Sequence, residues 1–199
     1  MVERARVAVL ALQGDFAEHC HALRAIGVEP IEARSARDLA GAAGLVLPGG
    51  ESTAIRTLLE RDGGELESAI RALHGEGRPV LATCAGLILI AREVRDPPAR
   101  SMGLLDVAVA RNGWGRQIAS AVEIADDGCT PVVLIRAPRI VETGDGVEVL
   151  ARLRGEPVLV REQNVVAATF HPELAGDLSV HRLAFPSCCD NVPAPASLV

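Results

Sequence analysis

Four short, mostly apolar runs divide the first half of the chain, and each is followed by a turn rich in glycine or polar residues. They lie at residues 6–12, 28–33, 44–47 and 79–83. Apolar runs of this length between such turns are typical of strands that are buried on both faces of a parallel sheet. The pattern therefore predicts four strands of one buried sheet.

Helical segments fill the intervals between these strands. The predicted helices cover residues 16–26, 35–43, 52–61, 65–74 and 85 to about 94. Asp15 and Ser52 stand where a polar side chain caps the first turn of a helix, and Gly27 stands where a glycine ends one. Strands that alternate with helices in this way indicate an α/β fold, with an open, mostly parallel sheet and helices on both faces.

The second half has a different character, because strand-like runs follow one another with few helices between them. A last helix is predicted at residues 177–185, and residues 1–185 are expected to form a single domain. Residues 186–199 hold three prolines and two adjacent cysteines, and we expect a disordered or loosely packed tail there. We expect antiparallel strands that extend or flank the sheet. They lie at residues 104–110, 117–124, 132–136, 147–153, 157–161 and 165–170.

Charge and composition exclude several classes of function. The net charge is −6, from 20 basic and 26 acidic residues, so the chain lacks the basic face that nucleic-acid binding requires. All 20 basic residues are arginines, which excludes a lysine Schiff base and the lysine of a P-loop. No apolar run approaches the ~20 residues of a membrane span. Since no signal-peptide pattern precedes the first strand, we expect a cytoplasmic protein with no membrane and no nucleic-acid partner.

One of the five cysteines, Cys84, stands where the fourth predicted strand turns into a helix. The small residues around it, Ala82, Ala85 and Gly86, are what a nucleophile elbow requires, because that sharp turn brings backbones close together. The helix N-terminus beneath the sulfur favours the reactive thiolate. A buried structural cysteine is the alternative. This segment alone leaves both interpretations open.

A histidine and a carboxylate follow the last predicted strand, in the sequence Phe170-His171-Pro172-Glu173. A histidine in this place can take up and return a proton, and a carboxylate two residues further on can fix its tautomer and stabilise the imidazolium. The proline between them keeps the two side chains in a stiff relation. Cysteine, histidine and acid in this order are compatible with a catalytic triad.

A pair of glycines follows the third predicted strand, in the sequence Pro48-Gly49-Gly50-Glu51-Ser52. Paired glycines allow backbone N–H groups to turn inward, and such groups at the start of a helix can form an oxyanion hole. An ordinary glycine-rich turn is the commoner case for such a pair on its own. The three segments together indicate acyl transfer through a thioester.

These three segments resemble class I glutamine amidotransferases, whose catalytic residues form a triad. The shared motifs are PGGES at 48–52, TCAG at 83–86 and FHPEL at 170–174. Further motifs are similar to a narrower family, the glutaminase subunits of pyridoxal 5′-phosphate synthases. They are LALQGD at 10–15, GGEST at 49–53, RNGWGRQ at 111–117, IRAP at 135–138 and HPEL at 171–174. The resemblance covers residues 5 to 185 and implies a flavodoxin-like fold.

The resemblance implies that L-glutamine is hydrolysed to L-glutamate and ammonia through a cysteinyl thioester on Cys84. It implies that His171 moves the protons, that Glu173 orients His171, and that N–H groups of Gly50 and Ala85 hold the oxyanion. The glutamine-binding residues would be Gly50, Glu51, Ser52, Arg111, Ile135 and Arg136. Of these, Arg111 or Arg136 suits the α-carboxylate of glutamine, and Glu51 suits its α-ammonium.

The resemblance also implies a partner, because ammonia is useful only where an acceptor receives it. In the family a separate synthase subunit takes the ammonia and builds pyridoxal 5′-phosphate, and the two kinds of subunit form a large hetero-oligomer. The lack of lysine fits this division, since imine chemistry must then take place on the partner. Gln13 and the first helix are expected near that interface. We expect neither a cofactor nor a metal ion on this chain.

Several positions depart from the family pattern, and they define the alternatives. Ala82 stands where the elbow usually has glycine, and Ala119 and Ala121 replace an acid and an aromatic residue. A regulatory subunit with impaired catalysis is one alternative, and a flavodoxin-like cysteine redox or stress protein is another. A metal site at His19 and His21 is the weakest hypothesis, because residues two apart on a helix point to different sides.

Overall fold

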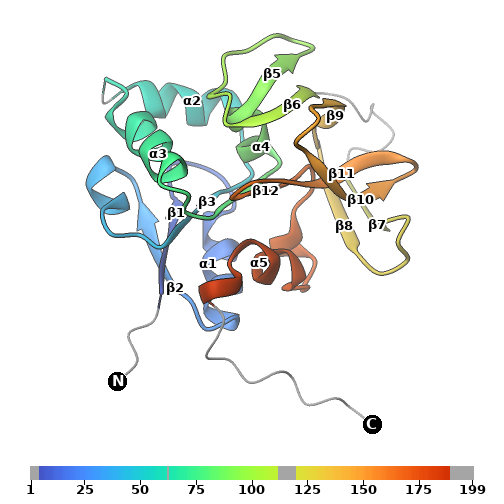
Figure 1. The fold of residues 1–199 in the computed structure, drawn as a ribbon, viewed down its shortest axis with the longest axis horizontal. Helices are drawn as coiled ribbons and strands as arrows, with labels where there is room; N and C mark the ends of the chain where they lie inside the picture. Colours follow the sequence, from blue (N-terminus) through green and yellow to red (C-terminus); the bar gives the residue numbers. More distant parts are fainter. Residues whose placement is uncertain (1–4, 62, 112–119, 189–199) are drawn as a thin grey trace.

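The core of the protein is a seven-stranded sheet with the order β10-β11-β12-β4-β3-β1-β2 (Figure 1). The computed structural model describes residues 5–61, 63–111 and 120–188. Strands β12, β4, β3, β1 and β2 run parallel, whereas β10 and β11 add an antiparallel extension beside β12. The strands span Arg6–Leu10 (β1), Glu29–Ala33 (β2), Gly44–Leu47 (β3), Val80–Thr83 (β4), Glu148–Leu153 (β10), Glu156–Glu162 (β11) and Val165–Ala168 (β12). The predicted α/β class is confirmed, and β10 and β11 are antiparallel additions from the second half as predicted. The strand predicted at 165–170 as antiparallel instead runs parallel to β4 as β12, because this fully buried strand lies inside the sheet between β4 and β11.

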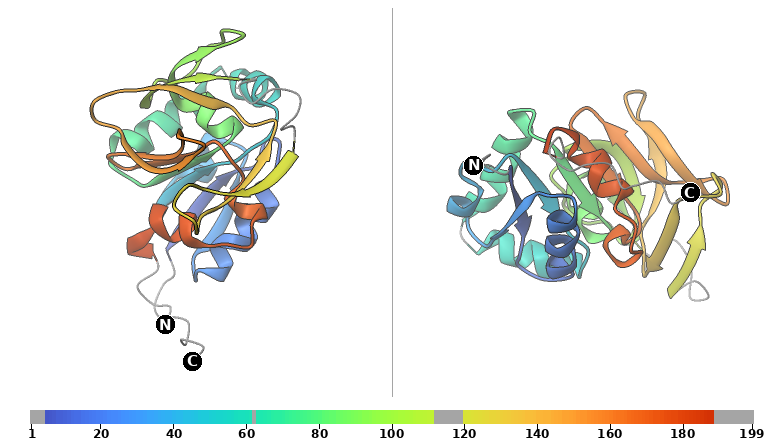
Figure 2. Two further views of the ribbon diagram at one scale, coloured as in Figure 1. Left: turned by 90° about the vertical axis from the view of Figure 1, so that its right-hand side faces the viewer. Right: turned by 90° about the horizontal axis from the view of Figure 1, so that it is seen from below.

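Helices cover both faces of this sheet (Figures 1 and 2). Along β1 the side chains alternate: Ala8 and Leu10 belong to one apolar cluster, and Val7 and Val9 belong to the other. The first cluster includes residues of α2, α3 and α4, and the second includes residues of α1 and α5. The helices span Phe16–Ala25 (α1), Ser52–Glu60 (α2), Glu65–Gly75 (α3), Ala85–Ile90 (α4) and Ser179–Ala184 (α5).

Two smaller sheets flank the central one. One has the order β5-β6-β9 and the other pairs β7 with β8. Their strands span Ala91–Arg95 (β5), Leu105–Ala110 (β6), Ser120–Ile124 (β7), Pro131–Ile135 (β8) and Arg139–Thr143 (β9). The predicted helix from residue 85 to about 94 is wrong at its end, because residues 91–95 pair with β6 as β5. Strand β9 was not predicted, since its exposed residues alternate poorly and it directly follows Pro138.

Local hydrogen bonds explain where other predictions differ from the structure. Residues 35–43 form only a short 3-10 helix, η1 (Ala36–Leu39), because Ser35 and Asp38 make a capping box that closes a single turn. The cap of α2 is Glu51 and not Ser52: its carboxylate accepts hydrogen bonds from two backbone N–H groups of the first turn. Asp15 stands before α1 but makes no side-chain cap hydrogen bond.

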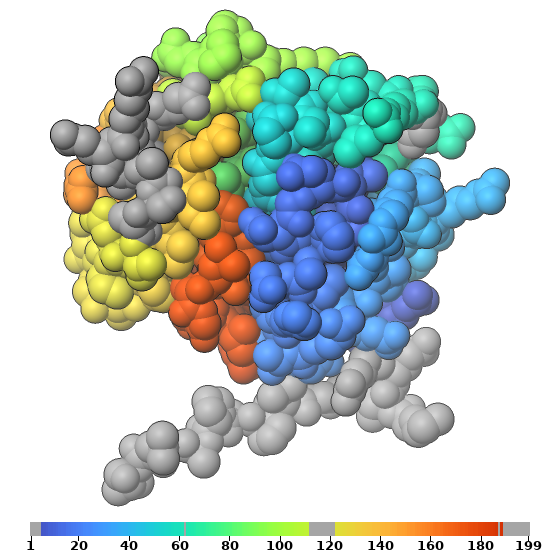
Figure 3. Space-filling model, turned by 180° about the vertical axis from the view of Figure 1, so that it is seen from behind, coloured from blue at the N-terminus to red at the C-terminus, as the bar shows by residue number. Residues whose placement is uncertain are grey.

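After β12 the chain forms two further 3-10 helices, η3 (Pro172–Leu174) and η4 (Pro186–Cys188). Residues 189–199, most of the predicted tail, lie outside the described residues, as does the predicted strand start at 117–119. Residues of α1 and of the segment around η3 and α5 lie next to each other on the surface seen in Figure 3. No helix in the described parts of the chain is long and apolar enough to cross a membrane.

The sheet order brings four predicted turns to one edge. Strand β4 lies between β12 and β3, and β1 is the next neighbour of β3. Because these strands are parallel, their carboxyl ends meet at the same edge, where open α/β sheets bind their ligands. Cys84, His171, the Gly49-Gly50 turn and the turn after β1 therefore lie side by side.

Candidate active site

Cys84 stands on a strained turn between β4 and α4. Its φ angle is 46°, in the left-handed region that residues with side chains rarely adopt, and the residue is 5% exposed. A Cβ added at Gly86 would lie 2.0 Å from the carbonyl oxygen of Leu47, so a glycine is needed for α4 to lie this close to β3. The Cys84 thiol lies 3.9 Å from the carbonyl oxygen of Ile135. This is the geometry of a nucleophile elbow, as predicted.

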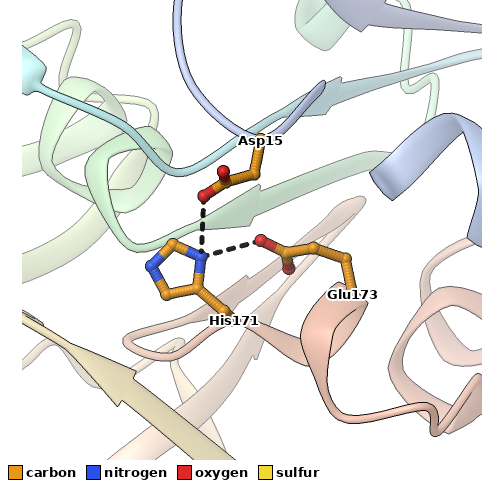
Figure 4. A group of neighbouring side chains, drawn as sticks. All are labelled: Asp15, His171 and Glu173. Atoms are coloured by element: carbon orange, nitrogen blue, oxygen red, sulfur yellow. Dashed lines mark hydrogen bonds and ion pairs between the residues drawn. The ribbon is translucent and has the colours of Figure 1, made fainter. Parts of the chain in front are cut away.

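His171 follows β12 and is held on both sides. Its backbone N–H donates to the carbonyl oxygen of Val133, and its Nδ1 lies 2.7 Å from Oε1 of Glu173 (Figure 4). Both residues are buried, Glu173 on the short η3 turn. A second carboxylate, that of Asp15, lies 3.5 Å from the same Nδ1. The predicted histidine–acid pair is thus formed, with Asp15 as an additional neighbour.

The charges of this group depend on one another. Burial tends to lower the pKa of His171, but hydrogen bonds with Cys84 and Glu173, together with their negative charges, outweigh it and raise that pKa to about 10. Burial raises the pKa of Glu173, while its hydrogen bond to His171 acts in the opposite direction. The raised pKa favours a protonated imidazole at neutral pH, with the Cys84 sulfur and the Glu173 carboxyl group as its neighbours.

Asp15, His171 and Glu173 also offer ligand atoms within 4.8 Å of one another, a set whose chemistry suits a metal ion. Two of the three are already joined by the hydrogen bond of the histidine–acid pair. The sequence-based expectation that this chain needs no metal stays a prediction.

The glycine pair after β3 lies directly against His171. A Cβ added at Gly49 would come within 2.3 Å of the imidazole Cε1, so a side chain at this position would displace the ring. The turn is tied to the end of β1, because the backbone N–H of Glu51 donates to Oε1 of Gln13 over 2.6 Å. Gly50, with a φ angle of 152°, belongs to the cavity wall.

A cavity of about 270 Å³ opens in front of these groups. Cys84 and His171 face it, together with every predicted glutamine-binding residue. Of the other predicted site residues, Glu173 and Ala85 are buried and are not part of the cavity wall. The wall consists of Gln13, Asp15, Gly50, Glu51, Ser52, Cys84, Ile88, Arg111, Ile135, Arg136 and His171.

The polar groups of the wall are partly engaged with each other. The guanidinium of Arg111 donates to Thr53 Oγ1 over 3.0 Å and lies 3.6 Å from the Glu51 carboxylate. The Glu51 carboxylate accepts from the backbone N–H groups of Thr53 and Ala54, and these hydrogen bonds contribute to a lowered pKa of Glu51. Arg136 has a φ angle of 48°, in the left-handed region that residues with side chains rarely adopt, and it lines the same cavity.

Sequence reasoning did not place several residues that the structure brings to the site. Asp15 was predicted as a helix cap and Gln13 as an interface residue, yet both line the cavity. The rule that parallel strands share one carboxyl edge would have found them, because both follow β1. Ile88 is hidden in the apolar pattern of α4, and nothing in that pattern distinguishes it.

The departures from the family pattern fall in different places. Ala82 is fully buried in the apolar cluster beneath α4, where its methyl group adds to the packing. Ala119 lies outside the described residues, and so does the Ala121 side chain. His19 is fully buried, whereas the side chain of His21 is 68% exposed, which agrees with the argument that the two do not face one ion.

The fold and this site together define a class I glutamine amidotransferase. The sequence profile of the SNO glutamine amidotransferase family matches residues 9–189, and the chain belongs to that family. The resemblance drawn from the motifs is thereby confirmed.

Known proteins agree with this assignment. The chain is 45% identical over 182 residues to the pyridoxal 5′-phosphate synthase subunit PdxT of Kosmotoga olearia, with 88% of this chain and 94% of the relative covered. It is 49% identical over 185 residues to the protein of that name from a Parafrankia species, with 89% and 90% covered. A crystal structure of a glutamine amidotransferase superposes with a TM-score of 0.84 at 43% identity, over 92% of this chain and 98% of that one.

Proposed function

We propose that this chain is the glutaminase subunit of a pyridoxal 5′-phosphate synthase, and that it hydrolyses L-glutamine and supplies ammonia to a synthase subunit. The family assignment and the names of the relatives support this function. The observation that carries it is the strained Cys84 at the cavity, facing a His171–Glu173 pair joined over 2.7 Å. This is the arrangement that nucleophilic catalysis of amide cleavage requires.

The first half-reaction forms a thioester. The thiolate of Cys84 attacks the side-chain carbonyl carbon of glutamine, and its electron pair makes the new C–S bond. Backbone N–H groups of Gly50 and Ala85 stabilise the negative charge that develops on the oxygen. His171, which is protonated in the resting site, gives its proton to the departing nitrogen. The C–N bond breaks, and ammonia leaves.

The second half-reaction releases glutamate. His171, now neutral, takes a proton from water as the water oxygen attacks the thioester carbonyl. The C–S bond then breaks and returns the electron pair to the Cys84 sulfur, so the resting thiolate and imidazolium are restored. Glu173 keeps the Nδ1 proton of His171 in place throughout, which leaves Nε2 free for these transfers.

Substrate binding uses other residues of the same cavity wall. Arg111 or Arg136 binds the α-carboxylate of glutamine, and Glu51 binds the α-ammonium. Gly50, Ser52 and Ile135 complete the binding wall. Because the Glu51 carboxylate already accepts two backbone N–H groups, its remaining lone pairs are the ones that serve the ligand.

The finer statements about assembly belong to the same proposal. We assign the synthase partner and this chain to one large hetero-oligomer in the cytoplasm, where reducing conditions keep the Cys84 thiol free. The negative net charge supports a chain that binds neither nucleic acid nor a membrane surface.

The test is glutamate release from L-glutamine by the purified chain, with and without the cognate synthase subunit, and with Cys84→Ala as the blank. We expect glutamate release that rises when the synthase is added and disappears in the variant. A folded complex of the two proteins that releases no glutamate would reject the proposal and favour a regulatory subunit with impaired catalysis.

A further inference from the structure

Behind the catalytic pair lies a row of buried polar side chains that the proposed chemistry does not use. His19 on α1, Thr83 at the end of β4 and His181 on α5 are each 0% exposed. They come from three separate elements, one of which ends next to Cys84. Burial of so many polar groups in an apolar core is costly unless they are paired. Their arrangement therefore calls for an explanation.

His19 connects the other members of this row. Its Nδ1 lies 3.0 Å from Nε2 of His181, and its Nε2 lies 3.1 Å from Oγ1 of Thr83. The same Nε2 lies 3.2 Å from Oε2 of Glu173, the carboxylate oxygen that does not face His171. Among the described residues, this oxygen has no hydrogen bond of normal geometry, so His19 provides its polar contact.

The charges determine which nitrogen of His19 carries the proton. Burial, together with the charges of His181 and His171, lowers the pKa of His19 well below its usual value, so the ring is neutral and has one N–H. A carboxylate oxygen 3.2 Å from Nε2 favours a proton on that nitrogen and opposes a lone pair there. Nδ1 is then the acceptor, and His181 donates to it through its own Nε2–H.

The resulting order of donors runs in one direction, from His181 to His19, whose Nε2–H donates to Oγ1 of Thr83 and also lies against Oε2 of Glu173. It leaves Nδ1 of His181 without a proton, and in the described part of the chain this buried atom has no hydrogen-bond partner. A buried nitrogen lone pair without a partner costs less free energy than a buried N–H without one, and unpaired buried N–H groups are accordingly the rarer of the two in proteins. The geometry of the row is thus consistent with a single set of tautomers.

We propose that His19 is a positioning residue, which holds the second oxygen of Glu173 so that the first oxygen faces Nδ1 of His171. This inference rests on the proposed function. Asp15, whose carboxylate lies 3.5 Å from the same Nδ1, is the competitor. The Asp15 side chain is 43% exposed and comes from a turn, whereas Glu173 is buried and held on η3. By fixing Glu173, His19 keeps a rigid, buried carboxylate as the partner of the base.

Substitutions at position 19 separate positioning from mere packing. His19→Leu removes the N–H donor, whereas His19→Gln places an amide N–H close to the position of Nε2. Leu23→Ala on the same helix is the matched control, because Leu23 is fully buried but belongs to the apolar cluster and not to the polar row. Each variant is assembled with the synthase subunit, and kcat and KM for glutamine are measured across pH.

We expect kcat of His19→Leu to fall about 10- to 100-fold with KM changed less than twofold, since a misplaced catalytic group lowers the rate by about that factor. His19→Gln should retain most of kcat. The alkaline limb of the kcat profile should move to lower pH in the leucine variant, because the Glu173 carboxylate then supports the imidazolium less well. Leu23→Ala should lose stability with kcat nearly unchanged.

Three results overturn the inference while the unaltered chain stays active: an unchanged kcat in His19→Leu, an equal loss in His19→Gln, or an equal loss in Leu23→Ala. If His19→Leu does not fold, His19→Asn replaces it, because the shorter amide does not reach the position of Nε2. An asparagine variant as active as the glutamine variant then contradicts the proposal. Failure of the unaltered chain to release glutamate is a different result, and it rejects the proposed function itself.

Discussion

Two clusters of ionisable side chains in this protein contain similar groups in opposite surroundings. The inner cluster, at the carboxyl edge of the central sheet, consists of Cys84, His171, Glu173, His19 and His181, all of them buried. The outer cluster, on the β5-β6-β9 sheet, consists of Arg92, Glu93, Arg95, Asp106 and Glu142, whose side chains are about half exposed.

The outer cluster has the shorter contacts. Arg92 lies 2.5 Å from both Asp106 and Glu142, while the His19–Glu173 contact in the inner cluster is 3.2 Å. Contact distance is nevertheless a poor guide to how much an ion pair contributes to stability, because water screens the outer charges and competes for their hydrogen bonds. The side chains of the inner cluster are buried, so solvent screens their charges much less and each neighbour shifts the protonation of the next. Substitutions in the inner cluster should therefore change activity and stability much more than substitutions in the outer cluster.

The largest effect is expected for the base of the inner cluster. His171→Asn should lower kcat for glutamine hydrolysis by at least ~10³-fold, because the proton transfers of both half-reactions lose their carrier. The iodoacetamide alkylation rate of Cys84 at pH 7 should fall as well, since the imidazolium no longer stabilises the thiolate. An alkylation rate equal to that of the unaltered chain would contradict the assigned ion pair.

A second prediction concerns the backbone contact beneath the nucleophile. Gly86→Ala should destabilise the fold by about 3 kcal/mol, because the new Cβ would lie 2.0 Å from a backbone oxygen that cannot easily move. Gly75→Ala is the control, since a Cβ at this helical position meets nothing within 4 Å and should stabilise the protein by about 0.5–1 kcal/mol. Urea unfolding of the two variants measures both effects, and equal midpoints would contradict the packing argument.

The acid sensitivity of the inner cluster provides a third prediction. Burial lowers the pKa of His181 to about 4, although the nearby charge of Asp177 acts to raise it. Between pH 6.5 and 4 the unfolded chain therefore binds more protons at this residue than the native chain, and stability falls as the pH falls. From pH 7 to pH 5 this one residue should account for about 2 kcal/mol.

The variant His181→Gln separates this contribution from that of His19, whose lowered pKa acts in the same direction, and from those of Glu173 and His171, whose raised pKa values act in the opposite direction. It should lose about 2 kcal/mol less than the unaltered chain between pH 7 and pH 5 in urea titrations. The exposed His21 is the control, and His21→Gln should keep the full pH dependence. Parallel pH dependence in all three proteins would show that His181 is not buried in its neutral form.

The smallest effect is expected in the outer cluster. Glu142→Gln removes the carboxylate that Arg92 and Arg95 share. Because all three groups are exposed, the midpoint of urea unfolding should change little, and any change should shrink when salt is added. Glutaminase kcat should stay the same. A loss of stability or activity comparable to that of Gly86→Ala would reverse the ranking of the two clusters.

Much of the fold and of the inner cluster could be predicted because it depends on local sequence. Buried parallel strands leave apolar runs such as residues 44–47, and a nucleophile elbow leaves small residues around Cys84. The strand β9 and the end of α4 were missed because pairing with β6, and not local preference, determines them. Tertiary contacts override propensity in such segments.

The His19 row could not be predicted for a similar reason. His19 and His181, which contact each other, are 162 residues apart in the sequence. Each lies in an ordinary helical pattern that does not distinguish it. Only the position of α1 and α5 on the same face of the sheet brings them together. The pair His171 and Glu173 could be predicted because its members are two residues apart. His19 and His181 could not, because they approach this pair only in the folded protein.

The role of Cys84 as the nucleophile is tested most directly by labelling with 6-diazo-5-oxo-L-norleucine, an electrophilic analogue of glutamine. The assembled complex is incubated with the analogue, digested, and analysed by peptide mass spectrometry. We expect one label per chain, on Cys84 among the five cysteines, with glutamate release lost in proportion and glutamine protecting against both. A label on another residue, or full labelling of Cys84 with glutamate release unchanged, would contradict that role.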